Sequence, residues 1–296
     1  MEEFRRQHDC EMYVTIHKRY AEIFAPAFKE IHFIPSDYFV DETEFNTNIW
    51  EQLPKDIYAT YYLEVGYPAV PSAQKIDLRL SGMVQNCANI LGVDYQNEFW
   101  PRLLPSEHPA EKNIIKEPYV CIGMKGSKQC KDWNNPKGWG DVVRFLKAKG
   151  FRVLCIDGED ITKDMHYQDI IDAGCEEFTG MLPLQERIDL LHNAKFFMGV
   201  GSGLSWLAWA AGIPVVMISG FSLPHSEFYT PYRVINTEVC HGCWSEMRYK
   251  YQPCQYTPCP VHAGTSRQWE CTTSITSEMV LEKVKRLLKD YNLDNL

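Results

Sequence analysis

The stretch KFFMGVGSGLSWLAWAAGIPVVMIS (195–219) decides the fold. Two apolar runs of strand length, 195–200 and 214–219, enclose a run of small residues and tryptophans of helix length, 203–212. A strand, a helix and a second strand joined by such short turns form a right-handed crossover in a parallel sheet. The stretch therefore predicts an α/β fold.

The same alternation extends toward the N-terminus. Apolar runs at 118–124 and 151–156 predict two more strands, and helical periodicity predicts helices over 138–149 and 182–194. Strands separated by helices of this length are typical of a parallel sheet. The sequence therefore predicts a Rossmann-like lobe over 118–238.

The first part of the chain is less regular. Residues 11–17 and 30–35 have the pattern of strands around a short helix, and 77–92 has the pattern of a helix that ends at a glycine. Together they predict a second, smaller α/β lobe over 1–117. An amphipathic helix is expected over the C-terminal residues, 276–296.

The composition excludes several classes of protein. The chain has 296 residues, of which 45% are hydrophobic and 23% charged, and its formal net charge is −9. Its lysines and arginines are dispersed, so no basic face for nucleic acid is expected. No apolar run reaches the roughly 18 residues of a membrane span, and the start MEEFRRQHDC (1–10) is too polar for a signal peptide. We therefore expect a soluble cytoplasmic protein.

A glycine–serine turn at 199–206 joins the strand and the helix of the opening stretch. Free backbone N–H groups and the helix dipole favour a phosphate at such a junction, and Ser202 and Ser205 add hydroxyl donors. The spacing matches neither a Walker motif nor a dinucleotide-binding motif. An anion site and a tight turn without a ligand both fit this pattern.

A second polar loop, KGSKQCKDWNNPKGW (125–139), follows the strand at 118–124 and opens on the same edge of the sheet. A lysine beside a serine is suited to a diphosphate, and a tryptophan could face a base or a sugar. The alternative is a solvated loop whose tryptophans cover the domain. The acidic loop 157–160 also opens here, where Asp157 could accept hydrogen bonds from ribose hydroxyls.

Five of the eleven cysteines lie close together near the C-terminus. A Cys-x2-Cys pair followed by two further cysteines can supply four thiolates to one tetrahedral metal ion, and both zinc and iron accept this geometry. A disulfide-linked or metal-free cluster is the alternative. Within the segment 239–275, the spacing favours Cys240, Cys243, Cys259 and Cys271 as ligands of one structural metal ion, and Cys254 and then the imidazoles of His241 and His262 are further candidates.

The two loops and the cysteine segment resemble the heptosyltransferases, and within them the bacterial autotransporter heptosyltransferases. The resemblance covers about 119–275 and includes the run SGFSLPHSEFYTPYRVIN (219–236), which precedes VCHGC. It implies a GT-B-like fold of two Rossmann-like lobes that transfers heptose, with inversion, from ADP-heptose to protein serines. It also implies an iron site built from the four cysteines, and a homo-oligomer.

The resemblance assigns roles to residues of both loops. Lys131 is placed on the donor phosphates, and the turn 202–206 is placed against the diphosphate. The donor-binding candidates are Ser127, Lys131, Trp133, Asn134, Asn135, Asp157, Ser202, Gly203, Leu204, Ser205 and Trp206.

The sequence departs from the broader family in two places. Where that family usually reads Asp-Thr-Gly-x-x-His, this chain has Gly201, Ser202, Gly203 and Trp206, which favours the protein-modifying subfamily or a different donor. No Gly-x-Gly-Asp-like loop with an acidic general base occurs in residues 1–60. The N-terminal lobe is therefore expected to be shortened.

An inverting transfer needs a base that takes the proton of the acceptor hydroxyl. Asp77, His225 and Glu227 are candidates, and the sequence selects none of them. Three functions follow: a protein heptosyltransferase, a transferase that uses another nucleotide sugar on a glycan or lipopolysaccharide, and an inactive nucleotide-sugar-binding or scaffold homologue.

Overall fold

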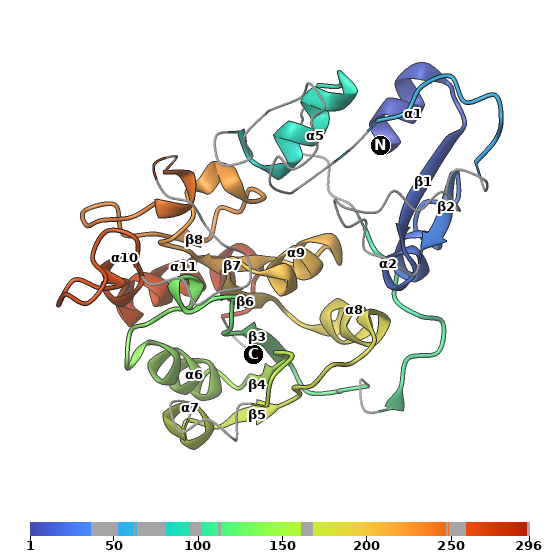
Figure 1. The fold of residues 1–296 in the computed structure, drawn as a ribbon. Coiled ribbons are helices and arrows are strands. Elements are labelled where there is room, and N and C mark those ends of the chain that lie inside the picture. The colour runs from blue at the N-terminus through green and yellow to red at the C-terminus, as the bar shows by residue number, and fades with distance from the viewer. Residues whose placement is uncertain are drawn as a thin grey trace.

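The structure is a computed structural model, and it describes residues 1–36, 53–61, 63, 81–94, 102–111, 114–160, 168–246, 248 and 259–294. In this part of the chain, a parallel sheet with the strand order β5-β4-β3-β6-β7-β8 forms the centre of the larger lobe (Figure 1). A second sheet consists of β1 and β2, which also pair in parallel.

The strands are β1 (Met12–His17), β2 (Ile31–Ser36), β3 (Tyr119–Gly123), β4 (Arg152–Cys155), β5 (Cys175–Glu177), β6 (Phe197–Val200), β7 (Val215–Ile218) and β8 (Arg233–Val234). The α-helices are α1 (Glu2–His8), α2 (Lys18–Phe24), α5 (Met83–Leu91), α6 (Gly138–Ala148), α7 (Gln168–Asp172), α8 (Leu184–Asn193), α9 (Gly203–Ala210), α10 (Glu270–Thr273) and α11 (Ser277–Asp290).

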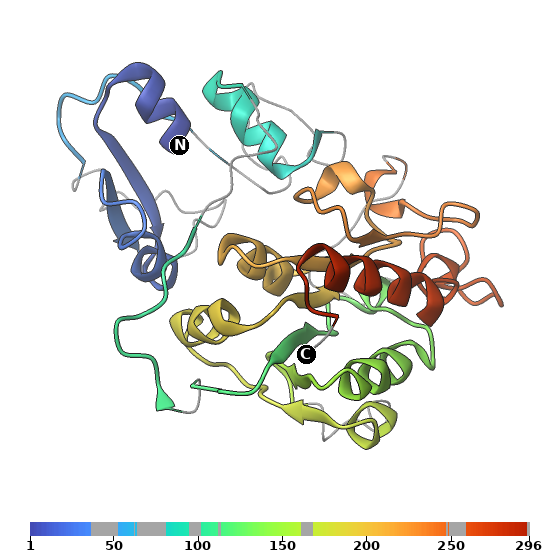
Figure 2. The same ribbon diagram turned by 180° about the vertical axis from the view of Figure 1, so that it is seen from behind.

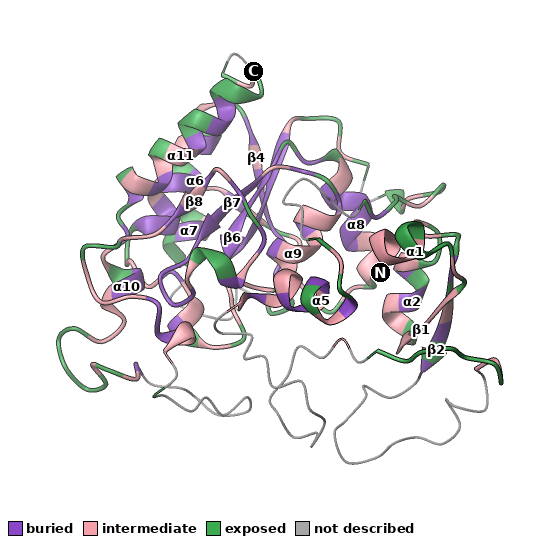
Figure 3. Cartoon of the chain, turned by 90° about the horizontal axis from the view of Figure 1, so that it is seen from above, coloured by how far each residue is buried: buried purple, intermediate pink, exposed green. Residues whose placement is uncertain are grey.

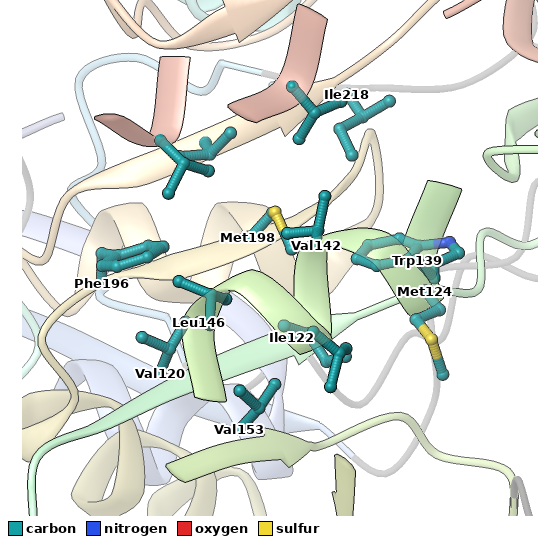
Figure 4. Close-up of a cluster of buried hydrophobic side chains, with 14 of the residues drawn as sticks. Val120, Ile122, Met124, Trp139, Val142, Leu146, Val153, Phe196, Met198 and Ile218 are labelled. Atoms are coloured by element: carbon teal, nitrogen blue, oxygen red, sulfur yellow. The ribbon is translucent and has the colours of Figure 1, made fainter. Parts of the chain in front are cut away.

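Helices cover both faces of the larger sheet because successive strand residues point to opposite sides. On one face, Val120 and Ile122 of β3 pack in the core beneath α6, α7 and α11 (Figure 4). On the other face, Tyr119 and Cys121 pack with residues of α8 and α9. Figure 2 shows α11 lying beside α6. Figure 3 shows that the strands of the larger sheet are the most buried layer of that lobe.

The predicted α/β fold is confirmed. The strands predicted at 11–17, 30–35, 118–124, 151–156, 195–200 and 214–219 are present as β1, β2, β3, β4, β6 and β7. The helices predicted over 138–149, 182–194 and 203–212 are present as α6, α8 and α9, and the C-terminal helix is α11.

Other elements were not predicted or are only partly described. The helix predicted over 77–92 is present as α5, and residues 77–80 lie outside the described residues. The short elements α1, α7, β5 and β8 were not predicted. The domain boundaries at 117, 238 and 275 stay predictions. No helix in the described ranges is both long and apolar enough to cross a membrane.

Leu103 connects the N-terminal region to the larger lobe. Its side chain is 1% exposed and packs with Ile23 of α2 and Ile188 of α8. Its backbone N–H donates to the carbonyl of Ala210 at 2.8 Å, and its own carbonyl is 2.7 Å from the Nε2 atom of His192. The segment before β3 is therefore anchored on α8 and α9.

We expect Leu103→Ala to lower the free energy of unfolding by about 2–5 kcal/mol, because it removes a buried side chain and leaves a cavity. Urea denaturation measures this change. The adjacent Leu104 is 46% exposed, so Leu104→Ala is the matched control and should change stability by no more than about 0.5 kcal/mol. Equal losses in the two variants would contradict the anchoring role of Leu103.

Candidate functional site

Three loops meet at one edge of the larger sheet. They follow the carboxyl ends of β3, β6 and β7, which are neighbours in the strand order β3-β6-β7. Ligands of α/β proteins bind at this edge, because the chain leaves parallel strands there and helix N-termini point toward it. The loops predicted to bind a nucleotide sugar therefore lie together.

The turn between β6 and α9 has the properties of an anion site. Ser202 is the N-cap residue of α9, and its side chain makes no capping hydrogen bond. The Ser202 hydroxyl is buried and has no hydrogen-bond partner among the residues that the structure describes. Beyond its chain neighbours and its own helix, no heavy atom of the described residues lies within 4 Å of the position that a Cβ on Gly203 would take. The N-terminus of α9 is thus open toward a ligand.

The other residues of this turn have internal roles. The Ser205 hydroxyl is fully buried and donates to the carbonyl of Val200 at 2.6 Å. Leu204 packs against the core on the α8 and α9 side. The Trp206 ring makes an edge contact with Phe228, with 5.1 Å between the ring centroids. These side chains shape the turn, and the groups that it leaves for a ligand are backbone N–H groups and the Ser202 hydroxyl.

Lys131 lies at the end of a short 3-10 helix, Gln129–Lys131, in the loop after β3. Burial lowers the pKa of its ammonium group, and the nearby carboxylate of Glu227 opposes this shift. In the described part of the chain, this ammonium group has neither an ion pair nor a hydrogen bond. It is therefore a partly buried cation that an anionic ligand could neutralise.

Glu227 forms a buried ion pair with Arg233. Its Oε2 atom is 2.6 Å from Nη1 of Arg233, and the two side chains are 7% and 9% exposed. A Cβ atom on Gly201 would lie 2.0 Å from Oε1 of Glu227. The carboxylate therefore contacts the backbone of the turn so closely that only glycine fits at this position. Glu227 therefore connects the loop after β7 to the anion site.

The structure selects no general base among the three candidates. Glu227 is committed to Arg233, and His225 is exposed in the short 3-10 helix Pro224–Ser226. Asp77 lies outside the described residues.

Several donor-binding candidates in the loop after β3 make internal contacts. The Trp133 ring is 4% exposed, and its Nε1 donates to the carbonyl of Ile275 at 2.8 Å. Asn134 donates to the Thr272 hydroxyl at 2.9 Å, and Asn135 donates to the carbonyl of Ile275 at 3.1 Å. These three side chains fix the loop to the residues before α11, and we leave them out of the donor contacts proposed below. Ser127 is exposed.

Asp157 also has an internal role. It is 1% exposed and accepts hydrogen bonds from the backbone N–H groups of Met124 at 2.8 Å and Lys125 at 3.3 Å. Burial raises the pKa of its carboxyl group, and these hydrogen bonds oppose the shift. Asp157 thus fixes the start of the loop after β3, and we also leave it out of the donor contacts.

Arg187 of α8 was missed by the sequence analysis. It is 4% exposed, and its guanidinium donates to the carbonyls of Gly180 at 2.8 Å and Asp157 at 3.2 Å. Its position on the apolar face of the helix, next to Ile188, could have indicated this role. Arg187 borders a cavity of about 260 Å³ beyond the carboxyl end of β5, lined by Glu177, Phe178, Thr179, Leu182, Glu186, Arg187 and Leu190.

The four predicted metal ligands lie near one another. Cys243, Cys259 and Cys271 are 5–8% exposed, and Cys240 is partly buried. Burial raises the pKa of Cys243 and of Cys271 to about 12, and the neighbouring thiols contribute in each case. In the described residues, however, no group of three or more Cys, His, Asp or Glu side chains is placed to hold a metal ion. The donor chemistry of four cysteines fits a tetrathiolate metal.

A parallel α/β sheet with an unsatisfied serine hydroxyl and a partly buried ammonium group at its carboxyl edge is typical of nucleotide-binding α/β proteins. The chain matches the family model "Glycosyltransferase family 9 (heptosyltransferase)" over residues 67–258, and it belongs to this family. The predicted enzyme class, a glycosyltransferase, is confirmed at this level.

Individual proteins are similar to this chain over almost its whole length. The autotransporter heptosyltransferase Aah of Escherichia coli is 43% identical over 286 residues, which cover 97% of this chain and 68% of Aah. The crystal structure of the dodecameric iron-containing heptosyltransferase TibC of enterotoxigenic E. coli, in complex with ADP-D-beta-D-heptose, is similar with a TM-score of 0.77 and 38% identity. The match covers 98% of this chain and 72% of TibC, so the GT-B-like fold is confirmed.

One relative is described as inactive. BimC of Burkholderia thailandensis, an inactive autotransporter heptosyltransferase, is 32% identical over 289 residues, which cover 96% of this chain and 63% of BimC.

Proposed function

We propose that this chain transfers heptose from ADP-heptose, with inversion, to serine side chains of an autotransporter protein. The observation that carries the proposal is the pairing of two unsatisfied groups at one sheet edge. They are the partly buried ammonium of Lys131 and the buried hydroxyl of Ser202, neither with a partner among the described residues. A diphosphate satisfies both. The names of Aah and TibC support heptose as the sugar.

In this proposal the leaving diphosphate lies between Lys131 and the N-terminus of α9. Negative charge develops on the leaving group as the glycosidic bond breaks, and the fixed ammonium, the Ser202 hydroxyl and the N–H groups of the turn stabilise that charge. The Glu227–Arg233 pair adds little net charge beside this site, so it does not repel the diphosphate. These groups speed departure of the leaving group whatever the identity of the base.

In this proposal, the nucleoside extends toward the cavity beyond β5. The strand order runs β5-β4-β3-β6, so the cavity lies three strand spacings, roughly 14 Å, from the turn before α9. An extended nucleoside diphosphate reaches over such a distance along the carboxyl edge. The buried Arg187 holds the loops that carry the cavity wall.

A second candidate function is that of an inactive sugar-nucleotide-binding or scaffold protein. It is favoured by the inactive relative BimC and by the pairing of Glu227 with Arg233, which leaves no base identified among the described residues. Tight ADP binding without any transfer would select it. A third candidate is a transferase that uses another nucleotide sugar on a glycan. It is distinguished from the first candidate by the nucleotide that the chain binds.

We expect ADP to raise the melting temperature of the chain more than GDP or UDP does. Lys131→Met should weaken ADP binding by roughly 10- to 100-fold, because it removes a charge-assisted contact worth about 1.5–3 kcal/mol. Isothermal titration calorimetry measures this loss. Lys137→Met is the matched control, since Lys137 is exposed at the start of α6.

We also expect the affinity for ADP to depend on pH. Because burial lowers the pKa of Lys131, its ammonium loses the proton at a lower pH than an ordinary lysine does. ADP affinity should therefore be full below that pKa and should fall as the pH rises through it, whereas Lys131→Arg stays charged and should not show the fall. If neither ADP nor any ADP-sugar stabilises the chain, the proposed function is wrong.

We further propose that Cys240, Cys243, Cys259 and Cys271 hold one structural metal ion, and that the chain forms a homo-oligomer. TibC is described as iron-containing and dodecameric, which favours iron over zinc. A metal ion with four thiolates and no open position cross-links chain segments and takes no part in the transfer.

Metal analysis of the purified chain should find close to one ion per chain, and Cys240→Ser should lose it. The loss is expected because one missing thiolate opens the tetrahedral site. Cys10→Ser, which changes a cysteine far from the cluster in the sequence, is the control and should keep the ion. Full metal content in Cys240→Ser would count against the site.

A further inference from the structure

The loop that carries Lys131 is held by the residues that follow Cys271. Trp133, Asn134 and Asn135 donate hydrogen bonds of 2.8–3.2 Å to acceptors at Thr272, Thr273 and Ile275. Thr272 is 1% exposed and the Trp133 hydrogen bond is buried, whereas the hydrogen bonds of Asn134 and Asn135 are partly buried or exposed. The position of this loop therefore depends on where the segment after Cys271 is fixed.

Cys130 provides a second connection between the same two regions. It directly precedes Lys131 in the short 3-10 helix and is 2% exposed. Its side chain packs with Phe221 and Cys243, one of the four candidate ligands. Cys130 also contributes to the electrostatic environment of the thiols of Cys243 and Cys271. A shift of the cysteine cluster would thus move the residue next to Lys131.

The loop after β7, which carries Glu227, touches the cysteine segment as well. The N–H of Gly242 donates to the carbonyl of Gly220 at 2.9 Å, and the N–H of Trp244 donates to the carbonyl of Phe221 at 3.0 Å. A Cβ on Gly220 would lie 2.0 Å from the carbonyl oxygen of Cys271, so the two segments are in close contact. The loop after β3 and the loop after β7 therefore both contact the cysteine segment.

We propose that the four-cysteine cluster positions the donor-binding loop, with Cys130 and Thr272 as the positioning residues between them. The inference rests on the proposed function, because it needs a nucleotide that binds at Lys131. Neither Cys130 nor Thr272 is placed on the donor, and both act through the position of Lys131. The cluster then affects the affinity for the donor through the position of Lys131, in addition to cross-linking the chain and stabilising the fold.

Reciprocity follows from this coupling. If the loaded cluster raises the affinity for ADP by some factor, bound ADP must raise the affinity of the cluster for its metal by the same factor. We expect a factor on the order of ten. Such a reciprocal effect is a readout that does not depend on transferase activity.

The first test compares ADP affinity in the metal-loaded and the chelator-treated wild-type chain, together with metal loss to the chelator in the presence and absence of ADP. Chelation should weaken ADP binding by roughly tenfold, and ADP should protect the metal by a similar factor. Equal ADP affinity in the two folded forms overturns the coupling and leaves the donor site intact. Failure of the loaded wild-type chain to bind ADP overturns the proposed function itself.

The second test uses variants at full metal occupancy, so that it does not need the stripped chain to stay folded. Thr272→Val removes the one acceptor of Asn134 that lies in the segment after Cys271, and Cys130→Ala removes the contact with Cys243. Both should keep the metal and raise the Kd for ADP and the KM for ADP-heptose by roughly tenfold, with little change in kcat. Cys175→Ala, which changes a buried cysteine of β5, is the matched control and should leave both constants unchanged. Wild-type ADP affinity in both Thr272→Val and Cys130→Ala overturns the proposal.

Discussion

A partly buried lysine ammonium without a counter-ion in the described chain is the constraint on which this site depends. Removing such a charge from water is unfavourable unless an anion or hydrogen-bond acceptors replace the lost hydration. Against this burial Lys131 has the fields of nearby groups: the Glu227 carboxylate contributes most but is already paired with Arg233, and Asp132 contributes less. In the proposed function, a bound diphosphate supplies the missing charge. Donor binding would then relieve the unfavourable burial of the ammonium group.

The rest of the structure keeps this cation in place. The parallel sheet brings the loops after β3, β6 and β7 to one edge, and core residues on both faces fix the strands that carry them. Gly201 admits the Glu227 carboxylate to the turn, and the internal hydrogen bonds of Trp133 and Asn134 fix the loop that ends in α6. The loop after β3 thus carries both Lys131 and the side chains of Trp133 and Asn134 that fix the loop. Those two side chains bind the segment that follows Cys271.

The sequence predicted the parts of the fold that have a strong period. The strands β3, β4, β6 and β7 are continuous apolar runs, because both faces of a parallel sheet are buried. The short elements α7 and β5 have too few residues to show a period. In the site, Ser202 was selected from its place at a strand end and Lys131 from the family resemblance, and their roles in donor binding stay predictions. The internal roles of Trp133, Asn135 and Asp157 were not, since a polar side chain in a loop has the same letter whether it contacts a ligand or a distant backbone carbonyl. The position of Arg187 on the apolar face of α8 was a usable signal of burial, but its partners could not be predicted because they are backbone carbonyl groups.

The most direct test of this account is the pKa of the Lys131 side chain, followed by its nitrogen-15 chemical shift against pH in the free and the ADP-bound chain, with Lys131→Arg to assign the signal. The account predicts a pKa below that of an ordinary lysine in the free chain and a marked rise when ADP binds, because the diphosphate replaces the lost hydration. An ordinary pKa that ADP leaves unchanged would contradict it.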